Sequence, residues 1–70
     1  MGDYILADKL YGFSIESGDV LRTKDGQEIL VKSVNSVDDG YDIYYTDLFE
    51  DEEGMYHLEE DDTIDLLIIE

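Results

Sequence analysis

Carboxylates are the side chains of this chain that could do chemistry, and they are concentrated in its second half. Residues 33–70 contain fourteen Asp and Glu and no Lys or Arg, whereas residues 1–32 contain six acids and all four bases. Such a surface repels nucleic acids and anionic membranes and attracts cations and basic proteins. Because like charges also destabilise a compact fold, we expect the acidity to serve the function. An origin in solubility or salt adaptation is the alternative.

No other residue pattern indicates catalysis or a dedicated metal site. The only histidine, His57, is expected on an outward strand face between Tyr56 and Leu58, and the chain has no cysteine. An EF-hand loop needs oxygen ligands at alternate positions and glycine at the sixth, and loops starting at Asp38 or Asp47 do not fit this pattern. The glycines do not form a phosphate-binding loop. We therefore predict a protein that is not an enzyme and that uses no cofactor or metal ion.

The chain has 70 residues and 8.0 kDa, enough for one small domain, and its composition favours a folded one. Acidic disordered segments have few aromatic residues, whereas this chain has six Tyr and two Phe with blocks of Ile, Leu and Val. No apolar run approaches the roughly 18 residues of a membrane span, and the N-terminus lacks the basic flank of a signal peptide. We therefore expect a cytoplasmic protein.

Short apolar stretches with an alternating or β-branched pattern predict strands. The change of parity between Val31 and Val34 predicts a β-bulge near Lys32 and Ser33. Segments rich in Asp and Gly predict hairpin turns, because these residues accept positive φ angles. The turns are expected at Lys24–Gly26, Asp38–Gly40 and Glu50–Gly54. The strands are expected at residues 19–23, 28–37, 41–48, 55–59 and 64–69.

Five strands with short connections predict a mainly β fold, specifically a small SH3-like antiparallel five-stranded barrel. We expect one acidic β domain over residues 1–70, with residues 18–70 as the barrel and residues 1–17 as an N-terminal extension packed on it. The alternative is an α+β fold in which residues 5–15 form a short helix against the sheet. Residues 64–69 are apolar on both faces near their end, which predicts a barrel seam or a contact with the N-terminal segment. Leu66–Ile69 could also be a dimer contact, so we expect a monomer or a weak dimer.

The spacing of the carboxylates suggests how the acidic half works. Carboxylates two residues apart on a strand are separated by roughly 6.7 Å. The phosphates of one DNA strand follow one another at an axial rise of about 3.4 Å, so this separation is close to two axial steps. An acidic strand and its loops can therefore imitate a row of phosphates, and Tyr44 can add a flat contact. The predicted partner-binding residues are Asp38, Asp39, Asp42, Tyr44, Asp47, Glu50, Asp51, Glu52, Glu53, Glu59, Glu60, Asp61, Asp62 and Asp65.

Four features together indicate a class of protein. They are the small size, the acidic run Asp38–Asp65, the absence of cysteine and the tyrosine-rich segment Tyr41–Tyr45, YDIYY. In these features the chain resembles the small acidic DNA-mimic proteins that bacteriophages encode to disable host DNA-binding proteins. The resemblance implies an inhibitor in the host bacterial cytoplasm that binds the basic surface of a DNA-binding protein and competes with DNA. A nucleoid-associated protein such as HU is an example of such a target.

A different class of function is an SH3-like adaptor module that binds a basic peptide or partner protein. In this hypothesis, aromatic side chains supply a groove and the acids select a basic ligand. The same aromatic residues could instead pack in the core and at the rim of the barrel. They are Tyr41, Tyr44, Tyr45, Phe49 and Tyr56.

Overall fold

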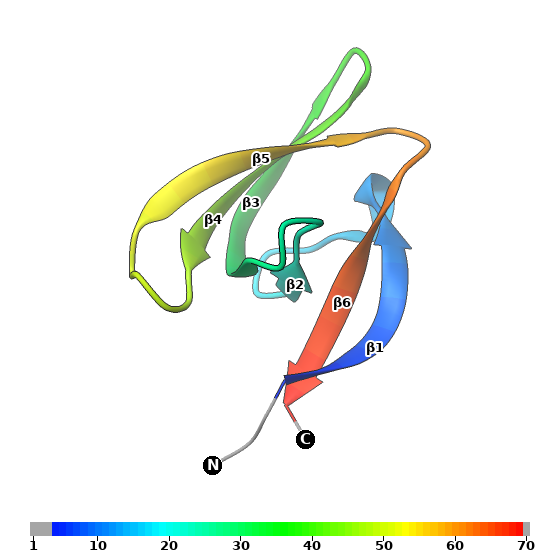
Figure 1. Ribbon diagram of the computed structural model, residues 1–70. Helices are drawn as coiled ribbons and strands as arrows, with labels where there is room; N and C mark the ends of the chain where they lie inside the picture. Colours follow the sequence, from blue (N-terminus) through cyan, green and yellow to red (C-terminus); the bar gives the residue numbers. More distant parts are fainter. Residues whose placement is uncertain (1–3, 70) are drawn as a thin grey trace.

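Six antiparallel strands and one 3₁₀ turn make up the part of the chain that the structure describes, residues 4–69 (Figure 1). In this computed structural model the strands form one sheet in the order β1-β6-β2-β3-β4-β5. Because β1 and β5 are the two ends of that order, hydrogen bonds do not close the sheet over the described residues. The elements are β1 (Tyr4–Tyr11), the 3₁₀ turn η1 (Gly12–Ser14), β2 (Val20–Arg22), β3 (Glu28–Val37), β4 (Gly40–Asp47), β5 (Glu53–Glu59) and β6 (Thr63–Ile69).

The mainly β prediction is confirmed, and the five expected strands correspond to β2–β6 with small differences at their ends. The sheet has six strands rather than five, because Tyr4–Tyr11 forms a strand that pairs with β6. This pairing overturns the alternative in which residues 5–15 form a helix. Pairing with β6 places Leu10 opposite Ile64, so the N-terminal segment packs an apolar side chain against the core as part of the sheet.

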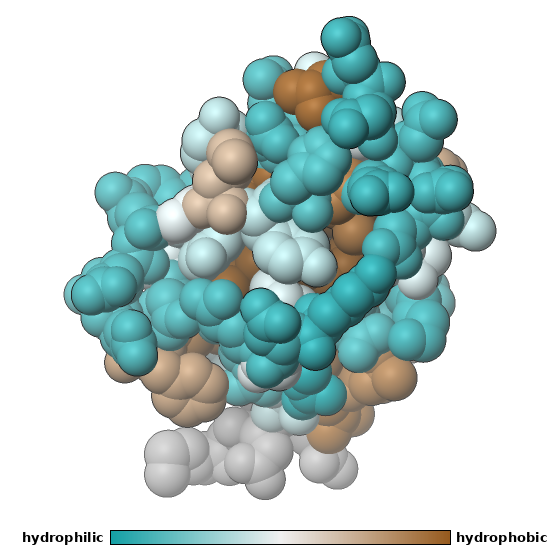
Figure 2. All heavy atoms as spheres, turned by 45° about the horizontal axis from the view of Figure 1, so that its top comes forward, coloured by the Kyte–Doolittle hydropathy of each residue, from teal (hydrophilic) through white to brown (hydrophobic). Residues whose placement is uncertain are grey.

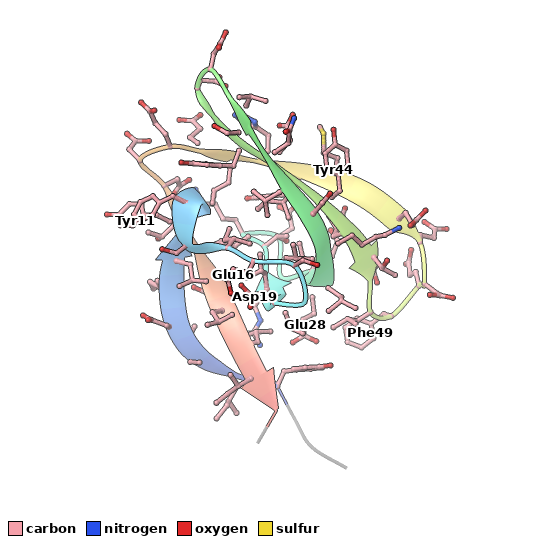
Figure 3. All side chains as sticks on the ribbon, turned by 180° about the vertical axis from the view of Figure 1, so that it is seen from behind. Tyr11, Glu16, Asp19, Glu28, Tyr44 and Phe49 are labelled. Carbon is pink, nitrogen blue, oxygen red and sulfur yellow. The ribbon has the colours of Figure 1, made fainter. Side chains whose placement is uncertain are left out.

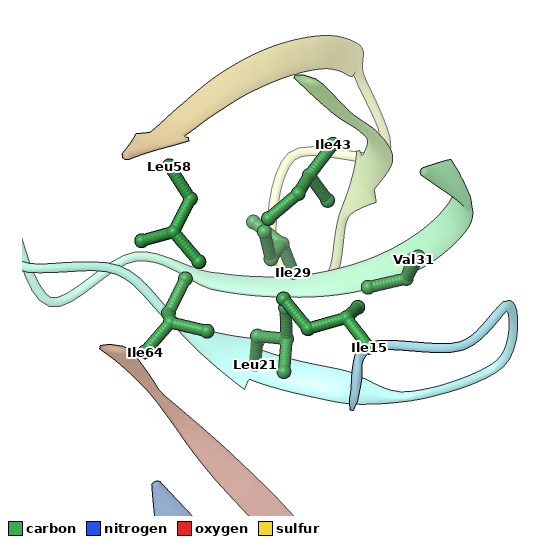
Figure 4. Packing of buried hydrophobic residues seen from close by; sticks show 7 residues of the cluster. All are labelled: Ile15, Leu21, Ile29, Val31, Ile43, Leu58 and Ile64. Atoms are coloured by element: carbon green, nitrogen blue, oxygen red, sulfur yellow. The ribbon is translucent and has the colours of Figure 1, made fainter. Parts of the chain in front are cut away.

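The core is a small cluster of aliphatic side chains that the curved sheet surrounds (Figure 4). β3 bends through a register shift between Val31 and Ser33, which confirms the bulge expected near Lys32. The bulge allows both Val31 and Val34 to pack in or against the cluster despite their different parity. The buried cluster consists of Ile15, Leu21, Ile29, Val31, Ile43, Leu58 and Ile64.

Turns form at or near the three expected places, and the third connection covers residues 48–52 because Glu53 and Gly54 already belong to β5. Glycine has a different role in the first two turns. Gly26, in the β2–β3 turn, has a φ of 87°, a conformation that favours glycine. Gly40 lies in β4 without a positive φ, and a Cβ atom there would be 2.2 Å from the carbonyl oxygen of Leu58. Glycine at position 40 therefore permits the close approach of β4 and β5. The expectation that this turn uses the chemistry of the Gly26 turn is wrong.

We predict that Gly40→Ala lowers the free energy of unfolding by about 1–3 kcal/mol, the usual effect of adding a methyl group where no room exists. The new Cβ would meet backbone atoms of Leu58 and Glu59, which cannot turn aside as a flexible side chain can. Ser36→Ala, at an exposed position of β3, is the control and should change stability by less than about 0.5 kcal/mol. Urea denaturation measures both, and equal stability of the two variants would contradict the close approach.

Candidate functional site

The fold separates the charges into two parts of the molecule. Residues 4–26 and 63–69, which include β1, β2 and β6, contain five acids and three bases, a net charge of −2. Residues 27–62, which include β3, β4 and β5, contain thirteen acids and one base, a net charge of −12. We call these the neutral part and the anionic part. Because the last strand of the chain belongs to the neutral part, this division does not follow the two halves of the sequence.

Exposed carboxylates of the anionic part lie in the connections between strands or at strand ends. Figure 2 shows the face that includes the β3–β4 turn and β5, and hydrophilic side chains cover most of it. Seven acids of this part are exposed and form no ion pair with another residue of the described range. They are Asp38, Glu50, Asp51, Glu52, Glu59, Glu60 and Asp61.

Together with Asp39, which pairs with His57, these seven acids form two groups, one at each end of β5. The turn cluster is made of Asp38, Asp39, Glu59, Glu60 and Asp61, and the loop cluster is made of Glu50, Asp51 and Glu52. The backbone N–H of Glu60 donates to the carbonyl oxygen of Asp39 at 3.1 Å, which joins the β3–β4 and β5–β6 turns. β5 is seven residues long and so places the two clusters about 20 Å apart.

Asp47, at the end of β4, organises the loop that carries the loop cluster. Its carboxylate accepts hydrogen bonds from the backbone N–H groups of Phe49 (2.7 Å) and Glu50 (2.9 Å) and from Nε2 of Gln27 (2.5 Å). The N–H of Glu50, then the Gln27 amide and the N–H of Phe49, hold the pKa of Asp47 below its ordinary value. Because Asp47 is only 8% exposed, its carboxylate serves the fold, and we leave it out of the acidic surface.

His57 lies in β5 between the two clusters and contacts two of the predicted partner-binding acids. Its Nδ1 is 2.9 Å from Oδ1 of Asp42, its cross-strand partner, and its Nε2 is 3.4 Å from Oδ1 of Asp39. The hydrogen bond with Asp42, and then the charges of Asp39, Asp42 and Glu59, raise the pKa of His57. When protonated, His57 reduces the negative charge beside the turn cluster. The hairpin register, which places Asp42 opposite His57, is the sequence signal that could have identified this pair.

All four bases lie within ion-pair distance of a carboxylate. The hydrogen bond between Lys24 and Asp62 raises the pKa of Lys24 and lowers the pKa of Asp62. Asp62 and Asp65 line a shallow depression together with three of the bases, so these two predicted partner-binding acids face cations of the neutral part. Glu53 is likewise paired. The pairs are Lys9–Asp65 (2.9 Å), Arg22–Glu28 (3.3 Å), Lys24–Asp62 and Lys32–Glu53.

The strands of the anionic part do not carry a continuous row of free carboxylates. In β4, the carboxylate of Asp42 is bonded to His57 and that of Asp47 to the following loop. In β5, Met55 and His57 stand at exposed positions between the acids at its two ends. The phosphate-like spacing expected along a strand is therefore replaced by two separate clusters at the ends of the strands.

The five aromatic residues considered for a peptide groove have different environments. Tyr45 and Tyr56 pack against the core cluster, and Tyr41 lies against η1. Tyr44 and Phe49 are exposed, and in Figure 3 they point outward from different parts of the β4–β5 hairpin. Packing therefore accounts for three of the five, and two aromatic side chains remain available to a partner.

Comparisons with known proteins add no match to this description. No family model, no curated protein and no solved structure matches the chain. Within residues 4–69, no helix is long and apolar enough to cross a membrane. In the same part of the chain, no group of three or more His, Cys, Asp or Glu side chains is arranged to hold a metal ion.

We predict that Asp47→Ala lowers the urea midpoint of unfolding, because two loop N–H groups and the Gln27 amide lose their acceptor. Since the pKa of Asp47 is lowered by folding, its contribution is present above the ordinary value of 3.8 and is lost as the pH falls through the folded value. The variant should therefore show a shallower loss of stability in acid. Glu52→Ala removes the same charge from an exposed position and is the control. Equal effects of the two substitutions would show that Asp47 acts through charge alone.

A second pH effect is expected from His57. A group whose pKa is raised by folding stabilises the folded state fully below its unfolded pKa, and this contribution disappears as the pH rises through the folded pKa. For His57 the decline begins near the ordinary value of 6.5 and continues above it. His57→Gln should therefore flatten the melting temperature between about pH 6 and pH 8. A thermal scan at each pH measures this, and identical profiles for both proteins would rule out a stabilising bond to Asp42.

Proposed function

We propose that this protein is a DNA-mimic inhibitor. It binds the basic DNA-binding surface of a host protein, for example a nucleoid-associated protein such as HU, and competes with DNA for that surface. The observation that carries the proposal is the separation of charge, with seven exposed acids free of ion pairs in one part of the molecule. A cationic groove that binds phosphates would be attracted to this part by long-range electrostatics.

The spacing of the two clusters also supports a mimic of DNA. The turn cluster and the loop cluster are separated by the length of β5, seven residues and about 20 Å. Measured along the axis of a DNA duplex, this separation corresponds to about six steps of about 3.4 Å. A groove that contacts phosphates over roughly half a turn of DNA could therefore engage both clusters at once.

Both clusters are held in place by contacts of the backbone. The carboxylate of Asp47 accepts two N–H groups at the start of the loop cluster, and the Glu60–Asp39 bond fixes the turn cluster. A partner that binds these acids therefore has less chain to order, and ordering is a main cost of association. This preorganisation supports a binding role for the clusters over a purely solubilising one.

Strands β2 to β5 form an antiparallel meander, and β6 returns beside β2. Leu58 of β5 and Ile64 of β6 meet in the core cluster (Figure 4). We infer that β2–β6 are an SH3-like unit whose two outer strands, β5 and β6, approach each other through side chains, and that β1 is an added strand beside β6.

The adaptor hypothesis retains one supporting observation. Tyr44 and Phe49 are exposed in the anionic part, and an exposed aromatic ring beside carboxylates is suited to a basic side chain. Such binding depends on local aromatic contacts as well as on charge. It should therefore survive added salt better than binding through the acidic clusters alone.

We predict that the protein displaces a fluorescent DNA duplex from purified HU, with about one inhibitor per DNA-binding site. Displacement should be strong at low salt and lost at about 0.5 M salt. Neutralising the loop cluster with Glu50→Gln, Asp51→Asn and Glu52→Gln should weaken competition by about tenfold or more. Asn at position 51 also accepts the φ of 55° that Asp51 adopts there.

The matched control removes the same number of charges from the neutral part, with Asp8→Asn, Glu16→Gln and Asp25→Asn. If net charge alone mattered, both triple variants would compete with DNA equally poorly. The proposal predicts that only the loop-cluster variant loses competition with DNA. Binding to HU at 0.5 M salt while the DNA remains bound would favour the adaptor hypothesis. Failure to displace DNA from HU and from other basic DNA-binding proteins at low salt would contradict the DNA-mimic proposal.

A further inference from the structure

Strand β5 leaves one of its two backbone edges without a partner strand in the part of the chain that the structure describes. It is the last strand in the order of the sheet and pairs with β4. β6 follows β5 in the chain but pairs with β1 and β2 instead. In Figure 1, β5 lies at the margin of the sheet and β6 turns away from it. The outer edge of β5 is therefore open to pairing with a further strand.

Two backbone hydrogen bonds at the ends of β5 show which of its residues face β4. The N–H of Asp47 donates to the carbonyl oxygen of Glu52 at 2.7 Å, and the N–H of Glu60 donates to that of Asp39 at 3.1 Å. Residues of an antiparallel strand bond alternately to the neighbour on one side and to the other side. The even-numbered residues between these two ends therefore bond to β4. The residues whose N–H and C=O groups point away from β4 are Glu53, Met55 and His57.

We call Glu53–His57 the open edge, and it lacks the usual protection of an edge strand. The register of β5 with β4 is continuous, whereas β1, the other edge strand, has a register shift between Leu6 and Asp8. β5 also contains no lysine or proline. Bulges, lysines and prolines are common means of preventing an edge strand from pairing. The open edge stops before Glu59, whose carbonyl oxygen accepts the N–H of Asp62 at 3.1 Å.

The acidic clusters determine which strand can pair with the open edge. The loop cluster lies at one end of β5 and the turn cluster at the other. If two copies of this chain paired their β5 strands antiparallel, the loop cluster of each would lie beside the turn cluster of the other. Full-length pairing would also place Glu53 opposite Glu59, and like charges directly opposite are destabilising. A second copy is therefore repelled, whereas a segment that carries Lys or Arg is attracted.

The two faces of the open edge favour different side chains in an added strand. Glu53, Met55 and His57 are exposed, whereas Gly54 and Tyr56 are partly buried, and Tyr56 packs against the core cluster. Residues directly opposite each other on antiparallel strands have their side chains on the same face. An added strand therefore has its residue opposite Met55 in water and its residue opposite Tyr56 beside the core. Alternating basic and apolar side chains fit this arrangement.

We propose that the open edge is a binding site at which a partner protein adds an extended basic segment to the sheet. The segment exchanges main-chain hydrogen bonds with Glu53, Met55 and His57, which is the mode of recognition called β-strand addition. Its Lys or Arg side chains lie between the two acidic clusters. This site goes beyond the proposed competition with DNA, because backbone pairing at β5 requires an extended peptide and no DNA-binding groove.

Calorimetric titration with a capped peptide of alternating lysine and valine, about seven residues long, tests this proposal at about 0.15 M salt. In the proposed pairing, the lysine N–H groups donate to β5 and the valine N–H groups point away from it. N-methylation of the lysine backbone should therefore weaken binding by about tenfold or more, because several hydrogen bonds are lost. N-methylation of the valine backbone should change the affinity by less than about threefold. Both methylated peptides have the same charge, so binding through charge alone would give them equal affinities.

Met55→Pro is the corresponding change in the protein. It removes an N–H group that points to the open edge and leaves the bonds between β4 and β5 in place, a position at which an edge strand tolerates proline. This variant should bind the unmethylated peptide about tenfold or more weakly. Met55→Ala, which keeps the N–H group, is the matched control and should bind like the wild-type protein. Circular dichroism shows whether each variant is folded, and the methylated peptides decide if Met55→Pro is not.

Three results would overturn the proposal. They are an unmethylated peptide that does not bind, a lysine-methylated peptide that binds as well as the valine-methylated one, and equal loss of affinity in folded Met55→Pro and Met55→Ala. The titration contains no DNA and no HU, so its failure would leave the result of the DNA-displacement experiment unaffected. Failure to displace DNA would likewise leave the response to methylation unaffected, and the two proposals are therefore tested separately.

Discussion

Repulsion among carboxylates is the constraint on which the rest of this structure depends. A net charge of −16 on 70 residues opposes the compact state. In the described part of the chain, eight apolar side chains are buried, each of which contributes about 1.5–3 kcal/mol when fully buried. A core of this size cannot also hold unpaired charges. In the anionic part, the sheet therefore places its free carboxylates in connections and at strand ends, where water solvates them, and every base of the chain is paired with an acid.

The few polar positions inside the fold connect the core to the acidic surface. Asp47 is nearly buried, and its carboxylate is stabilised by three hydrogen bonds rather than by a cation. Gly40 lets β4 approach β5, and the next contact along that edge is the bond from Glu60 to Asp39. The geometry of both acidic clusters thus follows from backbone hydrogen bonds and close packing. The charge of the carboxylates determines what the surface attracts, while these hydrogen bonds and backbone contacts determine where the carboxylates are held.

Local patterns in the sequence are sufficient to predict strands β2–β6 and the turns, because the conformation of each depends mainly on neighbouring residues. Alternation around Ile43 predicted β4, and the change of parity after Val31 predicted the bulge. The apolar pattern of residues 64–69 indicates a contact with the N-terminal segment, but the register of β1 with β6 joins segments more than fifty residues apart, and no local pattern specifies that register. Burial of Asp47 depends on Gln27 across the sheet, so a carboxylate in an acidic run was mistaken for a surface residue. The pair of His57 and Asp42 cannot be recognised from a local pattern, because the two residues are fifteen positions apart and meet only through the register of β4 with β5.

Separation of charge also determines which side of the molecule a cationic target can engage. The three bases of the neutral part are each paired with a carboxylate, so that part has little net charge to attract such a target. The turn cluster and the loop cluster are instead made almost entirely of acids without ion pairs. Because the contacts of Asp47 and of Glu60 hold the backbone that carries these acids, a groove that approaches the anionic part meets carboxylates in fixed positions, and the cost of ordering them on association is small.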